Sequence, residues 1–478
     1  MANMPDVTVG PPDDLGWRKV SINGKCAGKV RSPGELRKLL QQAGLMPGHP
    51  VHWLGGDSLS WPDRTAQRRI IGSLMFIGFL LTAGLLLRIG WMDSQRALTF
   101  GERLAGYSIL AAGLVELIAA GATLDYWHQR KRSYSGPFVL AGVAIVFLCS
   151  SSLLFLQIGE RFTGWTVIAI SFLAGSIVAG IELIRSRAWK GLRNPRRIAI
   201  GAIVPTLIAG INLAYTQLYV PTVTAPLIMS GAEFREASLD SARSVLRVTV
   251  HAYVKNNGSV PVYILGSIYW VHGGPANDIT QTRDPSFKLI YDGEFVTPVG
   301  RELDPGEEIS QDSVVDIKDP DKLNYETLRA QTEVYAIRRD RMTLPAAYGQ
   351  SRNTVEVLKR EGKWNPKEPK DAKYRDESRI SNSSEILNIA RGKQYIRVWK
   401  VSFGNWSRID VSISPPGNRI TLDSHNTHYR QHLIDRYGLS LARGSMDQTP
   451  FKTLLEKARS PEKDSSTDQP DQSDQSGQ

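Results

Sequence analysis

One carboxylate lies inside a stretch that is apolar enough to cross a membrane. Glu116 is near the middle of residues 104–124, and Asn212 lies in a second apolar stretch, residues 198–219. A charged side chain at membrane depth is costly, so it normally faces protein or water. We expect a protonated Glu116 that is hydrogen-bonded across helices, and the alternative is a proton or cation pathway.

A second candidate site is a group of histidines near the C-terminus. His425, His428, His432 and Asp435 are separated by three, four and three residues, which places them on one face if the segment is a helix. Imidazoles and a carboxylate so arranged are possible ligands of a transition metal. Because no HExxH-type glutamate lies between them, these histidines are weak candidates, and we predict no metal site.

Motifs for other chemistry are missing from the sequence. It contains no GxSxG elbow, no Walker loop, no GxGxxG after a strand and no set of kinase motifs. The two cysteines, Cys26 and Cys149, are too few and too far apart for a disulfide framework or a four-ligand zinc site. We therefore predict a protein that is not an enzyme and binds no cofactor.

Apolar stretches define the middle of the 478-residue chain. Each is long enough to cross a hydrocarbon core of about 30 Å. We predict a bundle of five transmembrane helices within residues 66–220, and no cleavable signal peptide precedes it. Small residues at helical spacing, Gly175 with Ala179 and Ser176 with Gly180, favour close packing of the fourth helix, and Pro205 suggests a kink in the fifth. The five spans are residues 70–87, 104–124, 138–158, 165–184 and 198–219.

Charge in the short flanks of these stretches indicates their orientation. Twelve Lys and Arg residues flank the spans on the side of the N-terminus, against four on the other side. Because such an excess marks the cytoplasmic side, we predict a multi-pass cell-membrane protein with a cytoplasmic N-terminus and an extracytoplasmic C-terminus. Membrane topology accounts for the positive charge of these flanks within the net charge of +11. Because no pattern of base-stacking residues accompanies the charge, nucleic acid is not an expected partner.

A small α+β module precedes the first span. Asn23-Gly24 suits a tight hairpin turn. Ser32 followed by Glu35 is a capping-box pattern, with Pro33 at the first helical position. We predict a cytoplasmic module over residues 13–65, preceded by a flexible N-terminus over residues 1–12.

The order of residues in this module resembles the bacterial branch of the GYF domain family. The resemblance implies an aromatic surface that binds proline-rich peptides, with Trp17, Trp53 and Trp61 as the binding residues. Lys29 departs from the family, which has proline at that position. The structural alternative is that these tryptophans are core aromatics of a small domain. The matching residues are Trp17, Gly24, Gly28, Ser32, Glu35, Leu36, Ala43, Gly44, Leu45, Pro50, Val51, Trp53 and Trp61.

Residues 221–459 change to an alternating pattern. Every second residue is apolar from Leu246 to Val254 and again from Val262 to Trp270, with a turn at residues 256–259, which predicts a hairpin with one buried face. Further short strands predict an extracytoplasmic β-sandwich of immunoglobulin-like architecture. The charged residues 359–379 predict a solvated insertion, and residues 460–478 lack the apolar residues needed for a core and are expected to be disordered.

These features together favour an interaction or adaptor protein. A cytoplasmic peptide-binding-like module is linked through the membrane to an extracytoplasmic β-sandwich. The expected partners are the lipid bilayer and proteins on both sides, including a proline-rich peptide in the cytoplasm. The alternative is a transport or ion-conducting subunit that uses Glu116.

Overall fold

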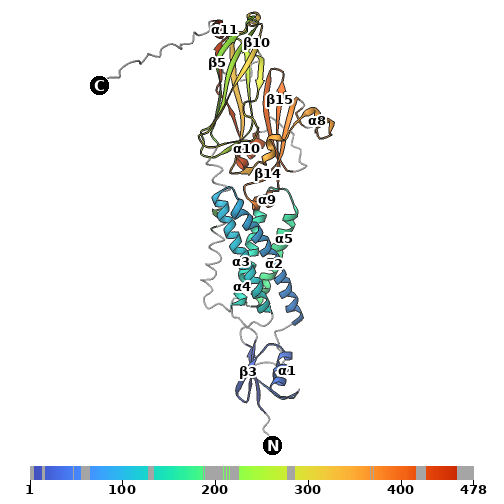
Figure 1. Cartoon of the computed structure of the whole chain (residues 1–478). Coiled ribbons are helices and arrows are strands. Elements are labelled where there is room, and N and C mark those ends of the chain that lie inside the picture. The colour runs from blue at the N-terminus through green and yellow to red at the C-terminus, as the bar shows by residue number, and fades with distance from the viewer. Residues whose placement is uncertain are drawn as a thin grey trace, which may run out of the picture. The chain divides into compact units, whose positions relative to one another are not determined.

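The computed structural model describes the chain as two compact units. The first comprises residues 1–216 together with Ser384–Arg391, and the second comprises residues 217–383 and 392–478. Figure 1 shows the course of the chain. The described residues are 5–12, 17–46, 48–54, 65–127, 134–186, 188, 208, 211–212, 215, 226–276, 286–365, 368–369, 371–415 and 427–459.

The N-terminal module is a four-stranded sheet covered on one face by a helix. Its strand order is β3-β2-β1-β4. Val9, Val20 and Val30 on the sheet and Leu36 and Leu40 on the helix form its core. The elements are β1 (Val7–Pro12), β2 (Arg18–Ile22), β3 (Lys25–Val30), α1 (Pro33–Gln42) and β4 (Val51–Trp53).

Local sequence signals in this module are matched by the structure, but its predicted start is wrong. Asn23 and Gly24 have φ of 49° and 75° in the turn between β2 and β3, as a two-residue hairpin turn requires. The Glu35 amide donates to Ser32 Oγ at 3.2 Å, which caps α1. Residues 7–12, predicted to be flexible, instead form β1, because Val7 and Val9 supply two fully buried side chains to the core.

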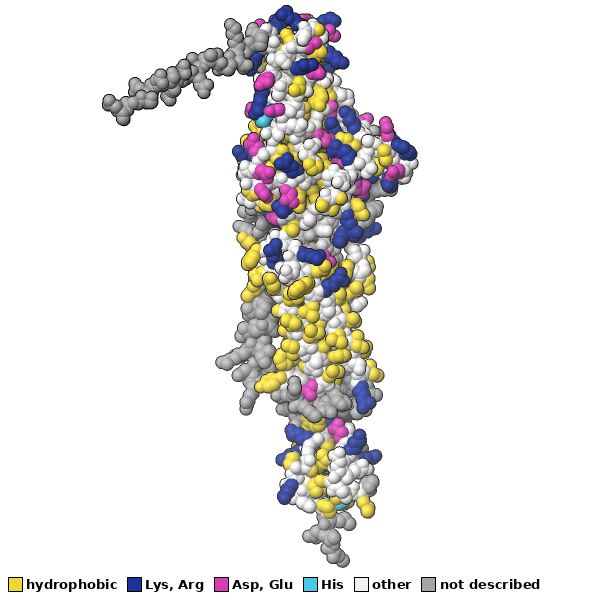
Figure 2. All heavy atoms as spheres, in the orientation of Figure 1, with side chains coloured by type: hydrophobic (Ala, Val, Ile, Leu, Met, Phe, Trp, Pro, Cys, Tyr) yellow, Lys and Arg dark blue, Asp and Glu magenta, His cyan; other side chains and the backbone are white. Residues whose placement is uncertain are grey.

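Among the described residues, four helices have the length and apolar composition of membrane spans, which indicates a membrane protein. Figure 2 shows apolar side chains covering these helices. The predicted fifth span, residues 198–219 with Pro205, lies almost wholly outside the described residues; within it, the Asn212 amide donates to the Gly101 carbonyl at 3.3 Å. The helices are α2 (Thr65–Arg96), α3 (Phe100–Trp127), α4 (Ser135–Leu156) and α5 (Gly164–Arg185).

Helices α2 and α3 approach each other along glycines. A Cβ on Gly106 would lie 2.5 Å from the Ser94 nitrogen, and one on Gly90 would lie 2.6 Å from the Leu110 nitrogen. Of the small residues predicted to pack in the fourth span, Ser176 is buried and Ala179 packs against the helix core, whereas no described atom lies within 4 Å of a Cβ built on Gly175. Small residues permit close packing but do not by themselves say which helix pair uses it.

The C-terminal region is β-rich and contains three sheets. The first sheet has the order β10-β6-β5, the second contains β17-β11-β7-β8 with β9 and β18, and the third contains β12-β14-β15-β16 with β13. The strands are β5 (Ile228–Leu239), β6 (Val245–Asn256), β7 (Val262–Gly274), β8 (Lys288–Gly293), β9 (Arg301–Leu303), β10 (Glu308–Lys318), β11 (Thr327–Arg338), β12 (Met342–Thr343), β13 (Arg352–Thr354), β14 (Ala372–Asn382), β15 (Gln394–Phe403), β16 (Trp406–Ser414), β17 (Ser440–Arg443) and β18 (Asp447–Pro450).

The second sheet is buried on both faces. One face of β7 and β11 shares a core with the first sheet, through residues such as Val250 and Val334. The other face shares a core with the third sheet, through residues such as Leu265 and Val398. Every residue of β7 and β11 is buried for this reason. The remaining helices are α8 (Val355–Arg360), α9 (Glu385–Arg391), α10 (Thr427–Tyr437) and α11 (Phe451–Arg459).

Two predictions for this region need correction. The alternating segments 246–254 and 262–270 are strands, but they do not pair with each other: β6 pairs with β5 and β10, whereas β7 pairs with β8, β9 and β11. Alternation identifies a buried face but not the neighbouring strand. The charged insertion 359–379 is also partly ordered sheet, because Arg375 and Asp376 lie buried in β14. The tail 460–478 lies outside the described residues.

Candidate functional site

A short helix from the β-rich part of the sequence packs against the membrane helices. Helix α9 joins β14 to β15 in the chain, yet residues 384–391 belong to the first unit. Asp93 on α2 accepts hydrogen bonds from the backbone amides of Glu385 and Ile386, the second at 3.3 Å. A carboxylate so placed satisfies amides that the first turn of a helix leaves unpaired and interacts favourably with the helix dipole.

The other end of α9 is held by an ion pair. Arg391 Nε lies 3.7 Å from Glu160 Oε1, and the two side chains are only 19% and 11% exposed. Between these two ends, Leu387, Ile389 and Ala390 are buried. Helix α9 is therefore fixed by one acidic residue at each terminus, with an apolar face between them. We call this arrangement the α9 clamp, defined by Asp93, Glu160, Arg391 and α9.

Sequence reasoning missed the α9 clamp. A local signal for the helix exists, because Ser384 precedes it and Gly392, with a φ of 74°, follows it. The partner Asp93 is 292 residues away from Glu385, and nothing in the local sequence of either segment indicates the other.

The intramembrane carboxylate lies between helices, as expected for a packing contact. Glu116 on α3 is fully buried, and its Oε2 is in hydrogen-bonding contact with the Thr82 hydroxyl on α2. Asn212 bonds to Gly101 at the start of α3, so the structure does not place the two predicted polar residues in one contact. Glu116 and Asn212 each link two segments of the first unit.

The predicted aromatic residues of the N-terminal module have different environments. Trp53 packs partly buried against the core of the module, with the Arg18 guanidinium 5.4 Å from its ring centroid. Trp17 is half-buried beside Arg31, at 5.9 Å. Trp61 lies outside the described residues. Both rings are partly buried: Trp53 packs against the core of the module, and Trp17 lies beside Arg31.

The histidine group is only partly described. His428 and His432 lie on α10 with Asp435, and His425 lies outside the described residues. Across the described ranges, no group of three or more His, Cys, Asp or Glu residues is arranged to hold a metal ion. The role of α10 in the described structure is packing, because Leu433 and Tyr437 are buried in the core beside the third sheet.

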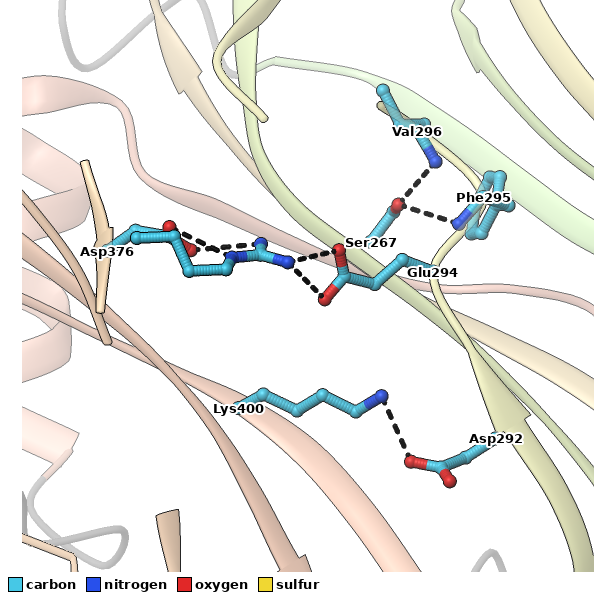
Figure 3. Close-up of polar contacts among 8 residues, drawn as sticks. Ser267, Asp292, Glu294, Phe295, Val296, Asp376 and Lys400 are labelled. Atoms are coloured by element: carbon cyan, nitrogen blue, oxygen red, sulfur yellow. Dashed lines mark hydrogen bonds and ion pairs between the residues drawn. The ribbon is translucent and has the colours of Figure 1, made fainter. Parts of the chain in front are cut away.

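Charged side chains join the second and third sheets of the β-rich region (Figure 3). Arg352 Nε lies 3.1 Å from Asp376 Oδ1, and its Nη1 lies 3.0 Å from Glu294 Oε2. Nearby, Lys400 Nζ lies 3.1 Å from Asp292 Oδ2, an interaction that lowers the pKa of Asp292 against the opposing effect of burial. These partly buried pairs fix the position of the third sheet on the second.

A buried histidine and a buried carboxylate reinforce the same contact. His272 on β7 is 2% exposed, and its Nε2 lies 2.8 Å from the Asn405 carbonyl oxygen. Burial lowers the pKa of His272 from 6.5 to about 4, so the neutral ring donates this hydrogen bond at neutral pH. Glu333 on β11 accepts from the Ile409 amide on β16 at 3.1 Å, and burial raises its pKa.

Comparisons with known proteins do not place the chain in a family. No family model matches it, and no curated protein matches it. Solved structures match parts of it. The ApaA protein from Bordetella pertussis is 13% identical over 25% of this chain and 85% of that chain, with a TM-score of 0.18. The sporulation control protein Spo0M from Bacillus subtilis is 10% identical over 50% and 96%, with a TM-score of 0.17. Beta-glucosidase 3B from Thermotoga neapolitana is 18% identical over 23% and 14%, with a TM-score of 0.13. Similarity this low carries no argument about function.

Proposed function

We propose that this chain is a membrane adaptor that links an N-terminal interaction module to a β-rich region across the bilayer. The observation that carries the proposal is the α9 clamp. Helix α9 lies between two strands of the β-rich region in sequence, and Asp93 and Glu160 hold it against helices α2 and α4. If the membrane helices only anchored the β-rich region, the covalent connection from the last span would be enough. The additional contact through α9 would not be needed.

The orientation in this proposal follows from charge. The excess of Lys and Arg in the flanks on the side of the N-terminus places the N-terminal module in the cytoplasm and the β-rich region outside. The β-rich region, an immunoglobulin-like sandwich extended by a third sheet in this proposal, presents a surface to extracytoplasmic protein partners. Movement of β14 and β15 on binding displaces α9, and the clamp passes that displacement to α2 and α4.

The N-terminal module is, in this proposal, a GYF-like domain that binds a proline-rich peptide. Trp17, which is half-buried, supplies an aromatic surface for a preformed polyproline helix. Lys29, in the edge strand β3, favours peptides with acidic flanks. Trp53 contributes to the stability of the module because it packs against the core.

Peptide binding is tested on the intact protein in nanodiscs by tryptophan fluorescence with proline-rich peptides that carry acidic flanks. We expect saturable quenching that Trp17→Ala abolishes and that Lys29→Glu weakens. Equal quenching of the wild type and Trp17→Ala would contradict the assignment of Trp17. No saturable change at millimolar peptide would contradict peptide binding by the module.

The adaptor topology is tested by reporter fusions to the full-length chain. A reporter active only in the cytoplasm is placed at the N-terminus and, in a second fusion, after residue 459, where the described part of the chain ends. We expect activity from the first fusion and none from the second, with the reverse pattern for a reporter active only outside. Activity of both fusions on the same side would contradict the adaptor, because both modules would then share one compartment.

A further inference from the structure

The buried carboxyl of Glu116 has an unusual hydrogen-bonding environment. Its side chain is 0% exposed. Oε2 contacts Thr82 Oγ1, whereas Oε1 has no hydrogen-bond partner among the described residues. Across the described ranges, no ion pair to Glu116 is present within 4.0 Å.

Thr82 indicates which group holds the proton. Its Oγ1 lies 3.1 Å from the Gly78 carbonyl oxygen and 3.2 Å from the Phe79 carbonyl oxygen, both in the preceding turn of α2. A threonine hydroxyl in a helix commonly donates to these carbonyls, and it has a single proton to donate. Once that proton is given to the backbone, the oxygen of Thr82 is free to accept a hydrogen bond from Glu116.

An ionised Glu116 does not fit this environment. Its negative charge would be shared over two oxygens, one of which has no donor in the described structure. An unpaired charge on a fully buried side chain is far more costly than a neutral carboxyl that makes one hydrogen bond. A bound metal cation is also a poor explanation, because the described residues contain no suitable group of ligands.

We propose that Glu116 is a proton-binding site in the membrane part of the protein. Its carboxyl keeps a proton on Oε2 at neutral pH and donates it in a hydrogen bond to Thr82 Oγ1. The bound proton joins α3 to α2, since after its loss the Thr82 hydroxyl would have to leave its backbone carbonyl partners to donate to the carboxylate. This inference is independent of the adaptor function and of the α9 clamp.

The test is infrared spectroscopy of the intact protein in nanodiscs at neutral pH. A protonated carboxyl has a carbonyl stretch that a carboxylate lacks. The difference spectrum between the wild type and Glu116→Gln should show loss of this carbonyl band with no loss of carboxylate bands. The matched control is Glu236→Gln, which changes a solvent-exposed glutamate on β5 and should remove carboxylate bands. Loss of carboxylate bands in Glu116→Gln would overturn the proposal.

Thr82→Val tests the direction of the hydrogen bond. Valine keeps the shape of the side chain and removes the acceptor, so the carbonyl band of Glu116 should remain and move to higher frequency. A band that vanishes in Thr82→Val, or keeps its frequency, would overturn the assignment of Thr82 as the acceptor. Both infrared readouts require a folded protein. Circular dichroism of the same samples therefore serves as the control that the helices are intact in each variant.

Discussion

The Gly106→Leu variant is expected to lose much of the stability of the α2–α3 pair. A Cβ at position 106 would lie 2.5 Å from the Ser94 nitrogen and 2.8 Å from the Asp93 carbonyl carbon. These are backbone atoms of α2, which can move away only if the whole helix shifts. Overpacking of a close contact costs about 1–3 kcal/mol or more, and leucine here adds three further carbon atoms. The measurement is the melting temperature of the full-length protein in detergent.

Gly121→Leu is the matched control for this prediction. Gly121 lies on the same helix, α3, and has open space where its Cβ would be. A leucine there meets no other described residue. The free energy of unfolding should therefore change by about ±0.5 kcal/mol at most, as is typical of open sites, and the melting temperature should stay close to that of the wild type. Equal melting temperatures for Gly106→Leu and Gly121→Leu would contradict the close α2–α3 contact.

The second large effect is an expected loss of stability of the β-rich region at acid pH, caused by protonation of His272. Its pKa is lowered by burial to about 4, against 6.5 for an unhindered imidazole. A group whose pKa is lower in the folded state binds more protons when unfolded, so stability falls as the pH drops from 6.5 towards 4. The difference between these pKa values corresponds to about 3 kcal/mol. The contribution of the neutral His272 to the free energy of unfolding is fully present above pH 6.5 and is lost as the pH falls towards 4.

The variant that isolates this effect is His272→Gln. Glutamine does not titrate, and its amide is able to donate to the Asn405 carbonyl in place of the ring. Protection of β7 and β11 amides from hydrogen exchange should fall from pH 6.5 to 4 more steeply in the wild type than in the variant. Buried carboxyls with raised pKa, such as Glu333 and Asp376, act in the opposite direction in both proteins. Parallel pH profiles would contradict a neutral His272.

Features set by nearby residues were predictable from the sequence. The turn at Asn23-Gly24 and the cap at Ser32 depend on residues within four positions of each other, and both occur. The apolar stretches that became α2 to α5 needed only length and composition. The alternation of Leu246 to Val254 identified a strand with one buried face, because side chains of a strand point alternately to opposite faces.

Features set by distant partners were not predictable. The pairing of β7 with β11 rather than with β6 depends on which sheet each strand joins, and the local pattern is the same in either case. Arg375 and Asp376 looked like solvated charges, yet both are buried because Glu368 and Arg352 pair with them. The α9 clamp depends on Asp93, which is 292 residues away from its partner Glu385.

The central claim is that Asp93 holds α9 against the membrane helices, and hydrogen exchange of the intact protein in nanodiscs tests it most directly. The amides of Glu385 and Ile386 donate to Asp93, so they should be protected in the wild type. In Asp93→Ala, loss of a cap costs about 1–2 kcal/mol, and exchange of these amides should rise roughly 5- to 30-fold, while amides in the middle of β14 and β15 keep their protection. Rapid exchange of Glu385 and Ile386 in the wild type, or equal protection in the variant, would contradict the account.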